Sequence, residues 1–160
     1  MDTVSDYYTY YRQPFEALYS QADGNFSVDG TAYNPIIFEY SPSGQVTAPL
    51  VAVANVGCEA ADFPPEVAGN IALISRGTCE FGLKSALAGA AGAEGVVIYN
   101  NAPGGISGGT LSPPPRPEGE YVPTVGVTQE NGTALLAALE AGSAVEGVLQ
   151  VNSIIENRTT

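Results

Sequence analysis

The sequence predicts a single α+β domain, a compact β-barrel or sandwich of about seven short strands flanked by two α-helices. Its 160 residues suit one domain with a sizeable core. Short apolar runs bounded by Gly, Pro and Ser dominate the chain, and only two stretches show the 3.6-residue spacing of a helix. Because these helices do not alternate regularly with the strands, a doubly wound α/β fold is not expected.

The first half of the chain is expected to be mostly strands. A Tyr-rich stretch predicts a strand from Tyr7 to Arg12, and "NFSVDGTAY" predicts a hairpin that turns at Asp29-Gly30. Two further short strands are expected at "IIFEY" and "LVAVANV", because Pro, Ser or Gly bounds each of these apolar runs.

A strand, a helix and a second strand are expected within residues 69–101. One face of the predicted helix carries four apolar residues at helical spacing, Leu83, Leu87, Ala90 and Ala91. Thr78 is its expected N-cap, and Lys84 is expected to form a solvated ion pair with Glu80. The continuous apolar run from Val96 to Tyr99 predicts a buried strand after the helix.

The last third of the chain begins with a stretch crowded with Gly and Pro, from Ala102 to Glu120. This composition predicts an irregular surface loop, which we expect to stay out of the core and to be able to cover a cleft. A short strand is expected from Thr124 to Val127, followed by a helix that ends at Gly142. Thr128 can cap this helix, and a turn at Asn131-Gly132 is the alternative to that start. "EGVLQVNSI" predicts the final strand.

Composition excludes several classes of partner and of chemistry. Five Lys and Arg against 17 Asp and Glu give a net charge of −12, which repels nucleic acid and anionic membrane surfaces. No apolar stretch approaches the roughly 20 residues that span a bilayer, so no membrane partner is expected. The chain has no histidine, which removes Ser-His-Asp and Cys-His catalysis and the usual zinc ligand. We therefore predict no catalytic, metal-binding or cofactor-binding residues in this chain.

Other features point to the secretory route. N-glycosylation sequons begin at Asn25, Asn131 and Asn157. The two cysteines, Cys58 and Cys79, fit a disulfide in an oxidising compartment better than a metal site, with two buried free thiols as the alternative. Passage through the secretory pathway is therefore expected.

The stretch "GNIALISRGTCEFGLKSALAGAAGAEGVVIYNN" closely resembles the central motif of protease-associated domains. In that family a strand meets Gly-x-Cys-x-Phe, a helix of small residues follows, and the next strand ends in Tyr-Asn-Asn. The matching residues here are Gly77, Cys79, Phe81, Tyr99, Asn100 and Asn101. With "VPTVGVTQENGTALLAAL", the resemblance covers roughly residues 36–152 of a single domain, 1–160. Residues 1–35 and 153–160 are expected to lead to and from a catalytic domain that is absent here.

The segments around this motif, "YSPSGQVTAPLVAVANVGCEAADFP" and "ENRTT", resemble fungal zinc aminopeptidases of the vacuolar and secreted leucine type. The resemblance implies a non-catalytic accessory domain whose partners are the parent catalytic domain and its peptide or protein substrate. Zinc is expected only in that other domain, and the family disulfide falls on Cys58 and Cys79. A luminal recognition module of a sorting receptor and a purely structural insert are the alternative functions.

Overall fold

Eight strands and two α-helices make up the part of the chain that the structure describes. The structure is a computed structural model, and it describes residues 22–106, 109–114, 117–143 and 145–153. In chain order the elements are β1 (Ala22–Val28), β2 (Thr31–Tyr33), β3 (Ile36–Ile37), β4 (Gly44–Ala52), the 3₁₀ turns η1 (Ala60–Asp62) and η2 (Pro65–Val67), β5 (Ile71–Ser75), α2 (Phe81–Ala90), β6 (Gly95–Tyr99), β7 (Thr124–Val127), α3 (Gln129–Glu140) and β8 (Glu146–Ser153). The strand predicted from Tyr7 to Arg12 lies outside the described residues.

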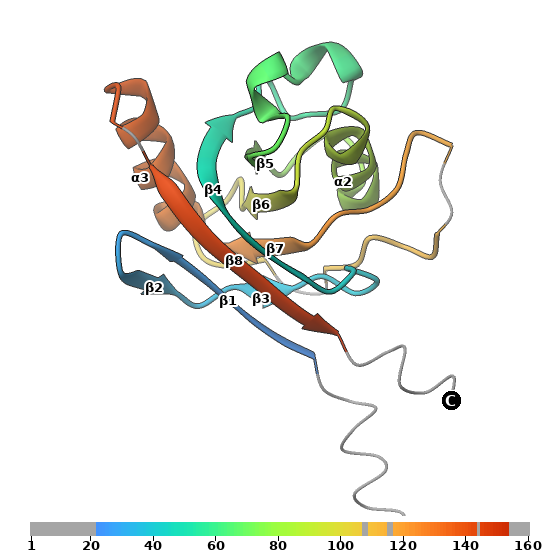
Figure 1. Cartoon of the computed structure of the whole chain (residues 1–160), viewed down its shortest axis with the longest axis horizontal. Helices are drawn as coiled ribbons and strands as arrows, with labels where there is room; N and C mark the ends of the chain where they lie inside the picture. The colour runs from blue at the N-terminus through green and yellow to red at the C-terminus, as the bar shows by residue number, and fades with distance from the viewer. Residues whose placement is uncertain (1–21, 107–108, 115–116, 144, 154–160) are drawn as a thin grey trace, which may run out of the picture.

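The strands form one mixed sheet in the order β2-β1-β8-β4-β5-β6-β7-β3. The pairs β4-β5, β5-β6 and β6-β7 are parallel, and the remaining pairs are antiparallel. The sheet curls into a half-barrel with the helices beside it (Figure 1). The predicted α+β class is therefore confirmed, with eight strands among the described residues rather than about seven.

The strands at the two described ends of the chain lie side by side. Strand β1 turns back into β2 at the predicted Asp29-Gly30 turn, where both residues have positive φ (52° and 81°). Along its other edge β1 pairs with β8 over its whole length, and Ala22 lies opposite Ser153. The chain therefore enters and leaves the described domain at one end of the sheet (Figure 1).

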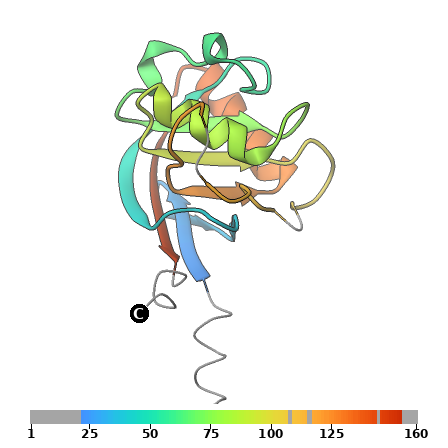
Figure 2. The same ribbon diagram turned by 90° about the vertical axis from the view of Figure 1, so that its right-hand side faces the viewer.

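Helices α2 and α3 pack on opposite faces of the central parallel strands (Figure 2, α2 yellow-green and α3 orange). On one face Leu73 of β5 joins Leu135 of α3 in a buried cluster. On the other face Ile74, the next residue of β5, joins Ala88 of α2. Because successive side chains of a strand point to opposite faces, the apolar run of β5 serves both clusters.

Helix α2 begins two residues later than the sequence predicts. Its first residue is Phe81, and Glu80 occupies the N-cap position. Thr78 instead sits in a tight turn with a positive φ of 67°, closed by a hydrogen bond of 2.7 Å from Cys79 N to the Gly77 carbonyl. The prediction that Thr78 caps the helix was wrong because this turn takes the residue out of the helix start.

The buried face of α2 also differs from the predicted one. The buried residues of the helix are Gly82, Lys84, Ser85, Ala86 and Ala88. Ala90 is exposed, and Leu83 and Leu87 are only half-buried. Small residues let α2 lie close to the backbone around Glu120. At Gly89, for example, a Cβ atom would collide with the Glu120 carbonyl. Leu87 and Ala91 of the predicted face do pack against a core cluster, but the spacing of the apolar residues did not reveal the fully buried small residues and Lys84.

Helix α3 forms as its sequence predicts. The Thr128 hydroxyl accepts a hydrogen bond of 3.0 Å from Asn131 N, which caps the first turn. The helix ends just before Gly142, whose positive φ of 88° suits the residue that follows a helix. Strand β7 also has the predicted bounds.

The described parts of the segment from Ala102 to Glu120 are irregular, as predicted, but they are not free of the core. Ile106 and Leu111 are buried, and Leu111 N donates a hydrogen bond of 2.9 Å to the Glu39 carbonyl. The Tyr121 hydroxyl donates to the carbonyls of Leu111 and Ser112. Two apolar anchors thus hold a segment that its Gly and Pro content predicted to lie outside the core.

Candidate functional site

The Tyr-Asn-Asn end of β6 is held by hydrogen bonds within the domain. Asn100 is buried, and its side-chain NH₂ donates to the carbonyls of Gly104 and Gly105 at 3.3 and 3.0 Å. Its carbonyl oxygen accepts from Arg76 at 3.1 Å and from Asn101 N at 2.9 Å. The Asn100 side chain therefore links the ends of β5 and β6 to the start of the long loop, which is a structural role.

The Gly-x-Cys-x-Phe turn lies beside that amide and is closed by a disulfide. Cys58 and Cys79 are bonded in the structure, with their Cα atoms 5.9 Å apart. The Arg76 guanidinium lies 5.6 Å from the centre of the Phe81 ring, and this ring packs against Phe38 with 4.7 Å between ring centres. These contacts hold Cys79 and Phe81 of the motif within the fold.

Lys84, the only lysine of the chain, is buried beneath this turn rather than paired with Glu80 at the surface. Its ammonium donates hydrogen bonds to the Val56 carbonyl and, at 2.9 Å, to the Gly77 carbonyl. Burial lowers the pKa of Lys84 to about 8, against the charge of Asp62, which raises it. The predicted solvated ion pair was wrong because two carbonyls next to the disulfide take the ammonium.

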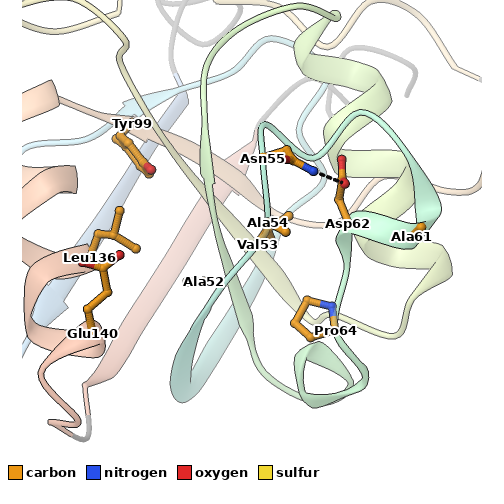
Figure 3. Close-up of a pocket in the computed structure, with 10 residues that line it drawn as sticks. All are labelled: Ala52, Val53, Ala54, Asn55, Ala61, Asp62, Pro64, Tyr99, Leu136 and Glu140. Atoms are coloured by element: carbon orange, nitrogen blue, oxygen red, sulfur yellow. Dashed lines mark hydrogen bonds between the residues drawn. The ribbon is translucent and has the colours of Figure 1, made fainter.

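A pocket of about 580 Å³ lies between the end of β4, the η1 turn and the C-terminal half of α3. The residues that line it are Ala52, Val53, Ala54, Asn55, Ala61, Asp62, Pro64, Tyr99, Leu136 and Glu140. Figure 3 shows Tyr99, Leu136 and Glu140 on one side of it and Asn55, Asp62 and Pro64 on the other. It lies beyond the carboxyl ends of the parallel strands β4 and β6, a common place for ligands in sheets of this kind.

The polar groups on the two sides of the pocket differ in whether they already have hydrogen-bond partners within the domain. Asp62 is committed to its own loop, because its carboxylate accepts from the Asn55 side chain at 2.8 Å and from Cys58 N at 3.2 Å. Burial raises the pKa of the Tyr99 phenol, a hydrogen bond with Ser75 lowers it, and the charge of Glu140 raises it. The Tyr99 phenol is protonated at neutral pH, as a tyrosine ordinarily is, so its hydroxyl can donate a hydrogen bond.

The predicted glycosylation sites have different surroundings. Asn25 is exposed on β1, Asn131 is half-buried in the first turn of α3, and Asn157 lies outside the described residues. Within the described ranges, no group of three or more His, Cys, Asp or Glu side chains is placed to hold a metal ion. In those same ranges no helix has the length and apolar character that crossing a bilayer requires.

The comparison with known families gives the identity of the fold. Residues 46–135, from within β4 to within α3, match the PA domain family. This chain belongs to the PA domain family. The match contains the disulfide, the β5-α2-β6 unit and every residue that lines the pocket except Leu136 and Glu140.

This PA domain is similar to parts of longer fungal proteins. It is 43% identical over 154 residues to a probable leucine aminopeptidase 2 of Aspergillus fumigatus, covering 96% of this chain and 30% of the relative. It is 41% identical over 158 residues to a leucine aminopeptidase 2 of Trichophyton equinum, covering 98% of this chain and 31% of that protein. The chain thus spans under a third of the length of these curated relatives.

Solved aminopeptidase structures contain the same fold. An aminopeptidase from Aneurinibacillus sp. strain AM-1 matches with a TM-score of 0.70 and 30% identity, over 90% of this PA domain and 37% of that chain. A zinc aminopeptidase from Bacillus subtilis matches with a TM-score of 0.68 and 29% identity, over 82% and 30% of the two chains.

The pocket of this PA domain was not predicted from the sequence. Its lining comes from three segments that are far apart along the chain: residues 52–64, Tyr99 at the end of β6, and Leu136 and Glu140 of α3. Tyr99 is the one lining residue that belongs to the sequence motif, and the motif alone does not indicate a pocket. One local signal was available: Glu140 is an acidic residue at the C-terminal end of a helix, where the helix dipole disfavours negative charge. An unfavourable residue at an exposed helix end indicates a role other than helix stability.

Proposed function

We propose that this chain is a non-catalytic accessory domain of a zinc aminopeptidase, where it contacts polypeptide substrate and modulates its access to the catalytic domain. One observation carries the proposal. The chain is a PA domain that is 41–43% identical to aminopeptidases of which it spans only 30–31%. A chain of this kind supplies one domain to a longer enzyme, and the chemistry belongs to the remainder.

The arrangement of the described ends supports an inserted domain. Strands β1 and β8 are antiparallel neighbours, and Ala22 lies opposite Ser153. A domain inserted into another needs entry and exit segments that lie close together, so that the host fold is interrupted at one place. The fold of this PA domain meets that requirement without any rearrangement.

The chemistry of the chain supports a non-catalytic role. It has no histidine to act as a general base, and its only lysine is enclosed by two carbonyls. The test is to dialyse the folded chain, measure bound zinc by elemental analysis and assay amino-acid amides and long peptides for cleavage. We expect no stoichiometric zinc and no hydrolysis. One zinc ion per chain, or turnover that survives repurification, would contradict the proposal.

A secreted or vacuolar location belongs to the same proposal. It is supported by the Cys58–Cys79 disulfide, which is stable in oxidising compartments, and by the sequons at Asn25, Asn131 and Asn157. Production through a eukaryotic secretory pathway, followed by mass spectrometry before and after removal of N-glycans, tests it. Loss of glycan mass at Asn25, which is exposed on β1, is the expected result, and an unmodified Asn25 would count against this route.

A further inference from the structure

Strand β4 extends beyond the strand that covers its outer edge. The β4–β8 ladder ends where Pro49 lies opposite Glu146, and the last hydrogen bond to that side runs from Leu50 N to the Val145 carbonyl at 2.8 Å. Beyond Leu50, β4 keeps only its other neighbour, β5, to which it is parallel. The final residues of β4 therefore have one paired and one open edge.

The backbone groups of Ala52 face the open edge. Val53 N donates to the Leu73 carbonyl of β5 at 3.1 Å, so the polar groups of Val53 point toward β5. Successive residues of a strand alternate in direction, so the N–H and C=O of Ala52 point the other way, as those of Leu50 do. The β4–β8 ladder ends at Pro49, so no described strand pairs with this edge at Ala52, and Ala52 is one of the residues that line the pocket. The open edge of β4 therefore borders the pocket.

The pocket also has a negative electrostatic character. Its charged lining residues are Asp62 and Glu140, and none of the lining residues is Lys or Arg. Helix α3 ends here with no basic residue in its last turn, so its C-terminal carbonyls add partial negative charge. Because Asp62 is already engaged with Asn55 and Cys58 N, Glu140 is the carboxylate available to a ligand.

We propose that this pocket binds an extended peptide segment that pairs with the backbone of Ala52 and places a Lys or Arg side chain at Glu140. Addition of a strand to an open sheet edge is a recurring mode of peptide recognition, in which backbone bonds give affinity and pockets read the side chains. Leu136, on the same side of the pocket as Glu140, and Pro64 on the opposite side give apolar surface for the stem of the basic side chain.

The inference rests on the proposed function and makes it specific. An aminopeptidase takes the amino terminus of its substrate at the catalytic centre, so that terminus is not available to an accessory site. The cationic group that contacts Glu140 is therefore the side chain of a Lys or Arg further along the peptide. A volume of about 580 Å³ is within the range of pockets that hold drug-sized ligands.

The test titrates the full 160-residue chain with fluorescent peptides and measures binding by anisotropy. The probe is an unstructured, N-acetylated octapeptide with one central lysine, compared with the same peptide carrying norleucine there. We expect the lysine peptide to bind about two- to fivefold more tightly, the range of an exposed ion pair. The preference should vanish in Glu140→Gln and persist in Glu130→Gln, which removes an equal charge from the exposed first turn of the same helix.

The backbone contact is tested on the ligand, which avoids any effect on folding. Two versions of the lysine peptide are N-methylated, one at the odd-numbered and one at the even-numbered residues. Only one set of N–H groups can face Ala52, so one version should lose at least about tenfold in affinity and the other should retain most of it. A free-amine version with norleucine separates the side-chain cation from an amino terminus, and equal affinity for this version would contradict the choice of a side chain.

Each other outcome decides against the proposal. Absence of peptide binding overturns it, and so does binding that Glu140→Gln leaves unchanged or that both N-methylated peptides retain. Binding to this chain but not to the longer aminopeptidase would mean that another part of the enzyme fills the pocket. None of these outcomes decides the proposed accessory role, which is tested separately by comparing cleavage of long and short substrates.

Discussion

Because Lys84 is buried, the free energy of unfolding of this PA domain should change with pH in the alkaline range. The variant Lys84→Met should lack this pH dependence. Burial lowers the pKa of Lys84 from 10.5 to about 8 in the folded chain. Between these two pH values the unfolded chain binds the lysine proton and the folded chain releases it. Because the unfolded state then binds more protons, the free energy of unfolding rises with pH across this window.

The size of the effect follows from the two pKa values. The difference between 10.5 and about 8, at about 1.4 kcal/mol for each pH unit, amounts to about 3 kcal/mol. The free energy of unfolding of the wild type should therefore gain about 3 kcal/mol relative to Lys84→Met between about pH 8 and pH 10.5. Burial raises the pKa of Tyr99, whose titration acts in the opposite direction but equally in both proteins, so the difference between them isolates Lys84.

The assay is urea unfolding of both proteins at several pH values from about 7 to 10. A second measurement does not depend on the variant folding: as the only lysine, Lys84 gives a single set of side-chain NMR signals whose titration can be followed directly. A midpoint near 8 is expected. A midpoint near 10.5, together with a flat difference in stability, would show that the ammonium is solvated and would refute the burial described above.

Three further predictions concern stability and are checked by thermal and urea unfolding. Reduction of the disulfide, whose cysteines are 21 residues apart, should cost about 3 kcal/mol and lower the Tm by several degrees, and an unchanged Tm would refute a structural role. Gly132→Ala should cost about 3 kcal/mol, because the new Cβ would overlap the Tyr99 side chain, and a loss below about 1 kcal/mol would contradict this close approach. Thr128→Ala removes the N-cap of α3 and should cost about 1 kcal/mol, with no change if the cap is dispensable.

A matched control separates the Gly132 effect from helix propensity. Thr133 is the next residue of α3 and is exposed, so Thr133→Ala changes the helix without touching Tyr99. We expect this variant to lie within about 1 kcal/mol of the wild type. A comparable loss in both variants would attribute the effect to the helix rather than to its packing on β6.

Elements with local sequence signals were predicted well. The Asp29-Gly30 turn needs positive φ at two positions, which its two residues readily adopt. The N-cap at Thr128 and the end of α3 before Gly142 each depend on one residue, so a short stretch of sequence is enough to predict them. The first helix was predicted less well, because the disulfide turn displaced its start and its buried face is made of small residues and one lysine. Local spacing cannot reveal that carbonyls from the 56–77 region enclose this lysine.

The candidate site shows the same limit of local signals. The motif residues were found from a contiguous stretch and the disulfide from the presence of two cysteines, but the pocket depends on α3 facing η1 across the ends of β4 and β6. That arrangement follows from the order of strands in the sheet, which the sequence does not state. Likewise, Ile106 and Leu111 were missed as buried residues because the Gly and Pro around them indicate loop structure, which does not exclude core contacts.

The proposed role of this PA domain is to contact polypeptide substrates of an aminopeptidase and to modulate their access to its catalytic domain. The most direct test compares kcat/KM for a long peptide and for a small chromogenic amino-acid amide, in the longer enzyme with and without residues 22–153. Because Ala22 lies opposite Ser153, a short linker can bridge the deletion. With folded fractions matched, the account predicts that kcat/KM falls more for the long peptide, since only an extended substrate can use binding energy outside the catalytic centre. An equal loss for both substrates, or none for either, would contradict it and leave a structural insert.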